Sequence, residues 1–396
     1  MAVTTADSEL AGAAHTGTRA RDAVWPLWFA LGSSLAAAFG VHWDIAWHRS
    51  IGRDAFWTPP HVAIYSAAVL GAVAALAQIV PATFGRRGAD AAAVRVLGFR
   101  GPLGAFIAAW GGVTMLASAP FDDWWHNAYG LDVKILSPPH IVLALGLLAL
   151  HLGALVMLAG AANRSASGEE SDGARRRLLE TLILIVGGNM LVALMTLFME
   201  KTVRPFMHGG SFYVIVGLAA PVVLASVQGA TGRRWAGATA TVAYSVFLLA
   251  LLWTFPLVPA QPKLGPVLVS VTSLIPPEFP LLLLPSALAL DAWSWRRRAR
   301  PGAATVVVGA VLFTAIFFAC QWPFASFLMS PHARDFFWGA RYFDFWMPAY
   351  AHYRRYTFLE EAGGATAVGV AAAVLASGLS IAAGRATGRW LGRLRR

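Results

Sequence analysis

The sequence predicts an all-α fold, a polytopic transmembrane bundle of about ten helical spans. Of its 396 residues, 57% are hydrophobic and only 13% are charged, and several apolar runs approach or exceed twenty residues. A run of that length is long enough to cross the hydrocarbon layer of a bilayer as a helix. The composition therefore predicts a membrane protein whose first partner is the lipid bilayer.

Ten spans are predicted from these runs. They are Trp25 to His48, Pro59 to Val80, Leu103 to Trp125, Pro138 to Gly160, Leu178 to Met199, Phe212 to Gln228, Trp235 to Phe255, Phe279 to Trp295, Ala304 to Ala319 and Gly364 to Ala383. We divide the chain into an N-terminal cytoplasmic tail (1–23), duplicated metal-binding transmembrane hairpins (24–162), a cytoplasmic linker (163–177), a second transmembrane region (178–384) and a basic cytoplasmic tail (385–396). The second region contains an outer aromatic segment (321–361), which is amphipathic and is expected to cover the outer ends of the hairpins.

The basic residues are placed as in an oriented membrane protein. The net charge is +11, but the basic residues fall in short loops between the apolar runs, so no nucleic-acid partner is predicted. Of the 31 Lys and Arg residues, 21 fall on one side of the predicted bundle. By the positive-inside rule, both termini are cytoplasmic in a plasma or inner membrane.

One stretch of the chain occurs twice. Residues 44–61 (DIAWHRSIGRDAFWTPPH) return as residues 122–140 (DDWWHNAYGLDVKILSPPH), with one residue inserted. Each copy contains an Asp, a His four residues later and a second His after a Pro-Pro pair. The two sets are Asp44, His48 and His61, and Asp122, His126 and His140. The topology places both near the extracytoplasmic face.

The spacing in each copy brings the three side chains together. An Asp and a His four residues apart share one face of a helix. The Pro-Pro pair begins the next helix, where proline is tolerated, so the second His faces back toward the first pair. The alternatives are an aromatic-rich interfacial loop and an Asp that only accepts a hydrogen bond from its His. The duplication favours two metal sites.

The types of ligand residue available limit which metal ions the two sites could bind. Cys320 is the only cysteine, which excludes an intrachain disulfide, a cysteine-based zinc site and an iron-sulfur cluster. One Asp and two His per site suit copper, with zinc or iron as the other occupants.

Other residues are candidates for supporting roles. Asp54 and Asp132 match each other after the turn, either as partners of the imidazole N–H groups or as helix caps. Trp47 and Trp125 are further candidates beside the ligands. His42 is expected to be interfacial and His151 to be a packed histidine within its span. The weaker ligand candidates are His208, His332, His352, Glu200 and Glu278.

These residues resemble the C subunit of the copper membrane monooxygenases, the family of particulate methane monooxygenase and ammonia monooxygenase. Asp44, Trp47, His48, Arg53, Asp54, Thr58, Pro59 and His61 fill the first motif of that subunit in register. Asp122, His126, Asp132 and His140 match its second motif, except that the family has Asn in place of Asp122. The resemblance covers residues 24–160, about a third of the chain.

The resemblance implies a copper-dependent membrane monooxygenase, or a subunit of one. Its catalytic and metal-binding residues would be the two Asp-His-His sets, acting with dioxygen on a small hydrophobic substrate. It also implies A-like and B-like partner subunits or a quinol reductant. Two alternatives remain, a non-enzymatic copper-binding or transport protein and a zinc-dependent intramembrane hydrolase. Transport sites favour Met and Cys ligands, and neither motif contains an obvious Ser or Glu beside the metal.

Overall fold

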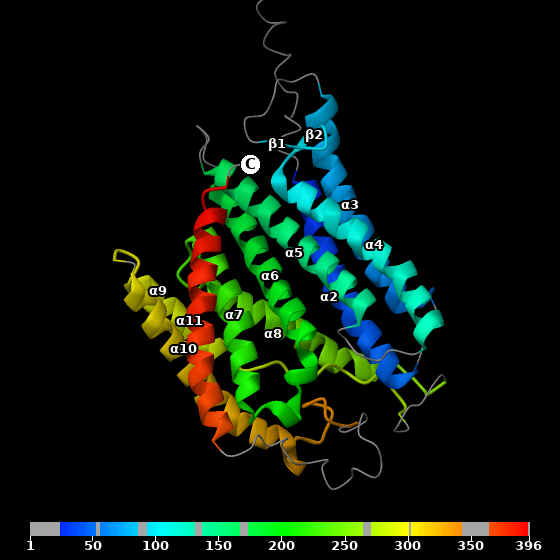
Figure 1. Ribbon diagram of the computed structural model, residues 1–396, viewed down its shortest axis with the longest axis vertical. Helices are drawn as coiled ribbons and strands as arrows, with labels where there is room; N and C mark the ends of the chain where they lie inside the picture. The colour runs from blue at the N-terminus through cyan, green and yellow to red at the C-terminus, as the bar shows by residue number, and fades with distance from the viewer. Residues whose placement is uncertain are drawn as a thin grey trace, which may run out of the picture.

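The chain folds into a bundle of long helices (Figure 1). The computed structural model describes residues 24–52, 56–85, 93–130, 137–166, 173–263, 271–300, 302–342 and 364–394. Within these residues, eight helices are long and apolar enough to cross a membrane. The prediction of a helical, multi-pass membrane protein is therefore confirmed.

The first four helices form two hairpins. They are α2 (Trp25–Ser50), α3 (Pro59–Phe84), α4 (Leu103–Tyr129) and α5 (Pro138–Ser165). Helices α3 and α5 each begin on a Pro-Pro pair, where the missing N–H groups would have no partner in the helix. Helices α2 and α4 end at the same side of the bundle, at the lower right of Figure 1. Helix α2 is 26 residues long but is not one of the eight apolar spans.

Glycines bring the helices of the second hairpin into close contact. Gly104 and Gly111 of α4 face Gly153 and Gly146 of α5. A Cβ atom on Gly111 would lie 2.8 Å from the Leu150 backbone nitrogen, and one on Gly153 would lie 2.7 Å from the Ala108 backbone nitrogen. Small residues at such contacts allow helix backbones to pack tightly in a membrane. This contact fixes the position of α4 relative to α5, and so of the residues near their ends.

A short β-hairpin between α3 and α4 was not predicted. Strands β1 (Val94–Val96) and β2 (Phe99–Gly101) pair antiparallel. Leu97 and Gly98 form the turn, with φ values of 49° and 88°. Positive φ at both central residues is typical of a type I′ turn, whose twist suits a hairpin. Thr83 donates a hydrogen bond to the Arg100 carbonyl at 3.0 Å and accepts one from the Arg100 amide at 2.9 Å.

The rest of the chain packs beside these hairpins. It comprises α6 (Gly173–Leu197), η3 (Met199–Lys201), η4 (Arg204–Phe206), α7 (Gly210–Thr231), α8 (Ala236–Thr254), η5 (Phe255–Leu257), α9 (Leu284–Arg296), α10 (Ala303–Met329), η6 (Pro331–Ala333) and α11 (Ala365–Leu391). Gly384 and Gly388 of α11 contact the backbone of α7 at Val222 and Ser226. Residues far apart in sequence therefore form one packed core with the first four helices.

The eighth predicted span, Phe279 to Trp295, is only partly a helix. Residues 274–283 form neither helix nor strand, and α9 has 13 residues, fewer than the 17 or so that a spanning helix needs. Pro276, Pro277 and Pro280 lack the N–H donors that a helix would use. Gln321 in α10 accepts a hydrogen bond from the Leu282 amide at 3.0 Å. Side chains thus satisfy part of this non-helical backbone inside the bundle.

Several predicted segment ends differ from those in the structure. Within the linker predicted at 163–177, α5 continues to Ser165 and α6 begins at Gly173. Helix α11 continues to Leu391, into the tail predicted at 385–396, and α10 continues to Met329, into the aromatic segment predicted at 321–361. In the described part of that segment, Trp338 packs on Phe279 and Phe327, and Tyr342 bonds to Thr272. These contacts lie in the second half of the chain; residues 343–363 lie outside the described part.

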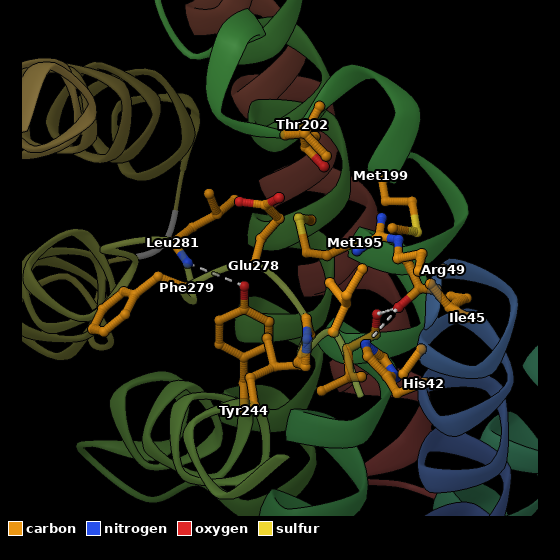
Figure 2. Close-up of a pocket in the computed structure, with 17 residues that line it drawn as sticks. His42, Ile45, Arg49, Met195, Met199, Thr202, Tyr244, Glu278, Phe279 and Leu281 are labelled. Carbon is orange, nitrogen blue, oxygen red and sulfur yellow. Dashed lines mark hydrogen bonds between the residues drawn. The ribbon is translucent and has the colours of Figure 1, made fainter. Parts of the chain in front are cut away.

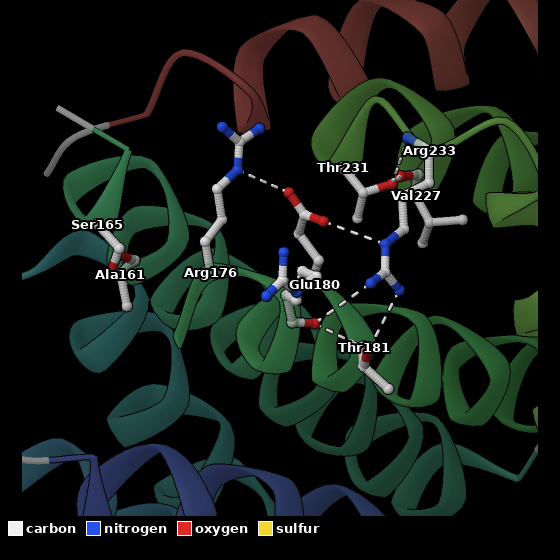
Figure 3. A network of polar contacts seen from close by, with 9 residues as sticks. Ala161, Ser165, Arg176, Glu180, Thr181, Val227, Thr231 and Arg233 are labelled. Atoms are coloured by element: carbon white, nitrogen blue, oxygen red, sulfur yellow. Dashed lines mark hydrogen bonds and ion pairs between the residues drawn. The ribbon is translucent and has the colours of Figure 1, made fainter. Parts of the chain in front are cut away.

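Polar contacts join several connections at one end of the bundle (Figure 3). Glu180 of α6, which is buried, pairs with Arg176 Nε at 2.8 Å and with Arg233 Nε at 3.1 Å. Arg233 also donates a hydrogen bond to the Thr181 hydroxyl at 3.1 Å. Asn163 of α5 donates to the Leu391 and Leu394 carbonyls, both at 2.7 Å. The α5–α6 connection, the α7–α8 turn and the end of α11 therefore lie together.

Candidate metal centre

The first Asp-His-His set forms a cluster at the end of α2 and the start of α3. Asp44 Oδ2 lies 3.7 Å from His48 Nε2, and Asp44 Oδ1 lies 3.4 Å from His61 Nε2. One ligand atom from each residue lies within 4.8 Å of the others, and among the described residues this is the only such group of three. The Asp44 and His61 side chains are about one-fifth exposed, whereas His48 is 44% exposed. The cluster is thus open on the His48 side.

A backbone carbonyl orients the His61 ring. The Nδ1 atom of His61 lies 3.3 Å from the Phe56 carbonyl oxygen. Because that oxygen only accepts, Nδ1 must carry the hydrogen, and Nε2 of the neutral ring keeps its lone pair. The Tyr65 hydroxyl donates to the same carbonyl at 3.1 Å. Phe56 and Tyr65 therefore hold the imidazole with Nε2 toward Asp44, as backbone partners of metal-binding histidines commonly do.

The second set repeats this geometry at the end of α4 and the start of α5. Asp122 Oδ2 lies 3.4 Å from His126 Nε2, and Asp122 Oδ1 lies 3.5 Å from His140 Nε2. Here the oriented ring is that of His126, whose Nδ1 lies 3.2 Å from the Gly130 carbonyl oxygen. Gly130 has a φ of 82°, a conformation that favours glycine. Each carboxylate thus faces two imidazole nitrogens, as the spacing predicts.

The donor atoms fit a small transition-metal ion. Nitrogen and carboxylate ligands bind such an ion at about 2.0–2.2 Å, so neighbouring ligand atoms lie about 3.3 Å apart around it. The Asp44 and Asp122 distances of 3.4 to 3.7 Å are close to that separation. Only the first set brings all three ligand atoms within 4.8 Å of one another among the described residues, so the second set would need a larger adjustment.

The residues predicted to support the metal ligands differ in their surroundings. Asp54 and Asp132 lie outside the described residues, so their predicted role stays a prediction. The indole nitrogen of Trp47 is buried and forms no hydrogen bond with any described residue. Trp125 packs on Phe121 and Tyr129 in an aromatic cluster at the end of α4. Such a cluster suits the membrane interface. Tyr65 was missed, although its position four residues after His61 places it on the same face of α3.

The other histidines within the described residues do not join either cluster. His42 is buried in the protein, where its Nδ1 donates to the Ala38 carbonyl at 2.9 Å and its ring packs on Phe247; its position at the membrane interface stays a prediction. His151 is the packed histidine that was predicted, with Nδ1 bonded to the Leu147 carbonyl at 2.7 Å. His208 stacks on Trp322 at 3.9 Å, and partial burial lowers its pKa from the ordinary value. His332 is exposed in η6, and His352 lies outside the described residues.

The two acidic ligand candidates, Glu278 and Glu200, also belong to neither Asp-His-His cluster. Glu278 pairs with Arg204, whose Nε lies 2.7 Å from Glu278 Oε2. Glu200 is an exposed residue of η3. Neither belongs to a group of three metal-ligand atoms among the described residues.

The chain was compared with known proteins in three ways. No protein-family model, no curated protein and no solved structure matches it. The candidate site therefore depends on the sequence motifs and on the geometry of these side chains.

Proposed function

We propose that this protein is a copper-dependent membrane monooxygenase, or a subunit of one, that hydroxylates a small apolar substrate. The observation that carries the proposal is the pairing of each Asp carboxylate with two imidazole Nε2 atoms in two matching sites. The doubled ligand sets of the sequence and their resemblance to the C subunit of the copper membrane monooxygenases support the choice of reaction.

The hydrogen bonding within each site favours a bound cation. In the neutral His61 ring, Nδ1–H donates to Phe56, so the Nε2 lone pair faces the Asp44 carboxylate at 3.4 Å. Two acceptors at that distance repel each other unless a proton or a metal ion lies between them. The same argument applies to His126, Gly130 and Asp122. A metal ion accounts for both sites and for the third ligand in each.

The chain's own residues would hold and tune the metal. The imidazoles supply neutral nitrogen ligands, and the carboxylate offsets the metal's charge and so lowers its reduction potential. Bound copper would supply dioxygen binding and electron transfer. The exposed side of His48 leaves room for dioxygen, and an apolar substrate would arrive through the bilayer. The overall reaction converts R–H, O₂, two electrons and two protons into R–OH and H₂O, so it requires a two-electron donor such as a quinol.

Metal analysis of the purified protein tests the proposal. We expect copper by mass spectrometry and by electron paramagnetic resonance in the parent, less in His48→Ala and in His126→Ala, and almost none in the double variant. His208→Ala is the matched control, because His208 belongs to neither cluster. The parent should also consume oxygen when supplied with a reductant and a small hydrocarbon or ammonia.

Other outcomes would contradict the proposal in different ways. Zinc in both sites would favour the intramembrane hydrolase, and copper without oxygen uptake would favour a carrier or store. Absence of any metal from protein prepared without chelators would reduce each cluster to an Asp paired with protonated histidines.

A further inference from the structure

The hairpin of β1 and β2 connects α3 to α4 at the end of the bundle away from the ends of α2 and α4 (Figure 1). One of its faces packs on the bundle. Val96 contacts the buried core, and a Cβ atom on Gly101 would lie 3.0 Å from the Ile79 side chain. Successive residues of a strand point to opposite faces. Arg95 and Arg100 therefore project from the other face, away from the core.

The two arginines lie directly opposite each other. The register pairs Arg95 with Arg100, one pair back from the turn formed by Leu97 and Gly98. Thr83 forms hydrogen bonds with both the amide and the carbonyl of Arg100, so these backbone groups face away from β1. Arg95 and Arg100 are thus a non-hydrogen-bonded pair, the kind whose side chains lie closer. Like charges in that position destabilise a hairpin.

This charge pair differs from other arginine sites of the molecule. Glu278 lines the cavity that Arg49 also lines (Figure 2). Glu180 pairs with both Arg176 and Arg233 (Figure 3). Neither arginine of the hairpin forms an ion pair with a described residue. An anion between these two guanidinium groups would relieve their repulsion.

Exposed apolar side chains lie beside the arginines. Leu97 is 84% exposed at the turn, Phe84 at the end of α3 is 71% exposed, and the Phe84 and Phe99 rings lie 6.4 Å apart. Helix α3 has 26 residues and so a length of about 39 Å, which reaches the headgroup layers of a bilayer. Leu97 has a φ of 49°, a conformation that is costly for leucine. An exposed leucine held at that cost indicates a role for its side chain.

We propose that this hairpin binds one anionic phospholipid, with the headgroup phosphate between Arg95 and Arg100 and the first acyl carbons beside Leu97. Guanidinium groups bind phosphate through paired hydrogen bonds. The positive-inside rule places this end of the bundle in the cytoplasm, where the leaflet contains anionic lipids. Binding requires no metal, so the proposal is independent of the function proposed for the Asp-His-His clusters.

Native mass spectrometry of the detergent-purified protein tests the proposal, with dioleoyl phosphatidylglycerol and the zwitterionic dioleoyl phosphatidylcholine added in equal amounts. We expect the double variant Arg95→Gln, Arg100→Gln to lose one phosphatidylglycerol that the parent retains, and to retain as much phosphatidylcholine. The matched control is Arg234→Gln, Arg298→Gln, which removes two exposed charges and should retain the parent's lipid. Equal retention of phosphatidylglycerol by the two double variants would overturn the proposal.

A charge reversal separates lipid binding from loss of the hairpin. In Arg95→Glu, the new carboxylate would face Arg100 and take the place of the anion. We expect a higher thermal midpoint than the parent's in detergent without lipid, and at least tenfold weaker binding of phosphatidylglycerol. Lipid binding equal to the parent's in Arg95→Glu would contradict a phosphate held between the two arginines.

A change at the turn distinguishes a lipid from a soluble phosphate ester. Leu97→Asn keeps both arginines, and asparagine adopts a positive φ more readily than leucine. It should bind phosphatidylglycerol several-fold more weakly than the parent, and millimolar glycerol 3-phosphate should not displace the lipid from the parent. Displacement by glycerol 3-phosphate, or unchanged lipid binding in Leu97→Asn, would overturn the choice of a lipid as the ligand.

Discussion

The ion pair between Arg204 and Glu278 is the residue-level contact on which we expect stability to depend most. Arg204 is almost fully buried and Glu278 is 27% exposed. Removing one partner of a buried pair leaves an uncompensated charge, which costs about 3 kcal/mol or more. Glu278→Gln should therefore lower the free energy of unfolding by about 3 kcal/mol, measured as a lower thermal midpoint in detergent.

Two comparisons separate the charge effect from a general loss of packing. Glu200→Gln, at an exposed acid, should change stability by less than about 1 kcal/mol. The double variant Arg204→Met, Glu278→Leu should regain part of the loss, because it removes the Arg204 charge together with that of its partner. A midpoint for Glu278→Gln that equals the parent's would show that the pair contributes no net stability.

At the same scale, the sequence predicted which candidate ligand residues lie together but not which groups orient them. The four-residue spacing placed Asp44 with His48, and the Pro-Pro pair at the start of α3 placed His61 opposite them. The oriented ring depends on the Phe56 carbonyl, and a backbone carbonyl has no signature in the sequence. Tyr65 was the one residue in the sequence that could have indicated this arrangement, because it shares a helical face with His61 and donates to the same carbonyl.

At the scale of elements, the glycine contact between α4 and α5 determines the second candidate metal site. In Gly111→Ala, the new Cβ atom would lie 2.8 Å from the Leu150 nitrogen and 2.9 Å from the Gly146 oxygen. Both are backbone atoms, so the helices must separate. We expect a loss of about 1–3 kcal/mol, seen as a lower thermal midpoint, and reduced metal at Asp122, His126 and His140.

A glycine in an open position gives the matched control. In Gly378→Ala, within α11, the nearest atom to the new Cβ is the Ala310 Cβ at 3.8 Å. That substitution should be neutral or should stabilise the helix by up to about 1 kcal/mol. If Gly111→Ala and Gly378→Ala changed the thermal midpoint equally, the close α4–α5 contact would not explain the loss of stability in Gly111→Ala.

The predicted elements were accurate where apolar runs decide the structure, as in α3, α5 and α7. The predicted helix was shorter than the observed one where a helix continues into polar or basic residues, as α11 does through Arg385 and Arg389 to Leu391. Hydropathy marks the part of a helix inside the bilayer, whereas backbone hydrogen bonds extend beyond it. The hairpin at Leu97 and Gly98 was missed because its strands have only three residues each.

At the scale of the whole molecule, hydrogen bonds and ion pairs indicate at which of the two ends of the bundle each loop between helices lies. At the first end, the α7–α8 turn lies with the α5–α6 connection and the end of α11 through Arg233, Glu180 and Asn163. Asp291 of α9 accepts a hydrogen bond from the Ala238 amide at the start of α8. That bond places α9 toward the same end.

The other end of the molecule holds the end of α2 and the connection after α8. The Lys263 amide donates a hydrogen bond to the Ile51 carbonyl at 2.9 Å, which ties the extended stretch after α8 to the end of α2. Arg204, in the connection between α6 and α7, contacts Trp338 beyond α10. The connections that follow α2, α6, α8 and α10 therefore belong to this second end.

This division predicts a topology in which α9 and the non-helical residues before it together return the chain across the bundle. The basic residues of the first end include Arg233, Arg234, Arg296, Arg297 and Arg298. Since the positive-inside rule places such loops in the cytoplasm, both candidate metal sites would face the opposite side. Among the described residues eight helices are long and apolar enough to cross a membrane and α9 is too short to be one, so the count of ten crossings stays a prediction.

Labelling of single cysteines in intact cells tests this orientation. In a Cys320→Ser background, which removes the only native thiol, a membrane-impermeant maleimide should label Lys201→Cys and Phe336→Cys. Arg234→Cys and Arg298→Cys should react only after the cells are opened, because their loops would be cytoplasmic. All four positions are exposed, so access across the membrane, and not burial, decides the result. The reverse pattern would place the Asp-His-His clusters on the cytoplasmic side, and labelling of Arg298→Cys together with Lys201→Cys would show that α9 does not return the chain.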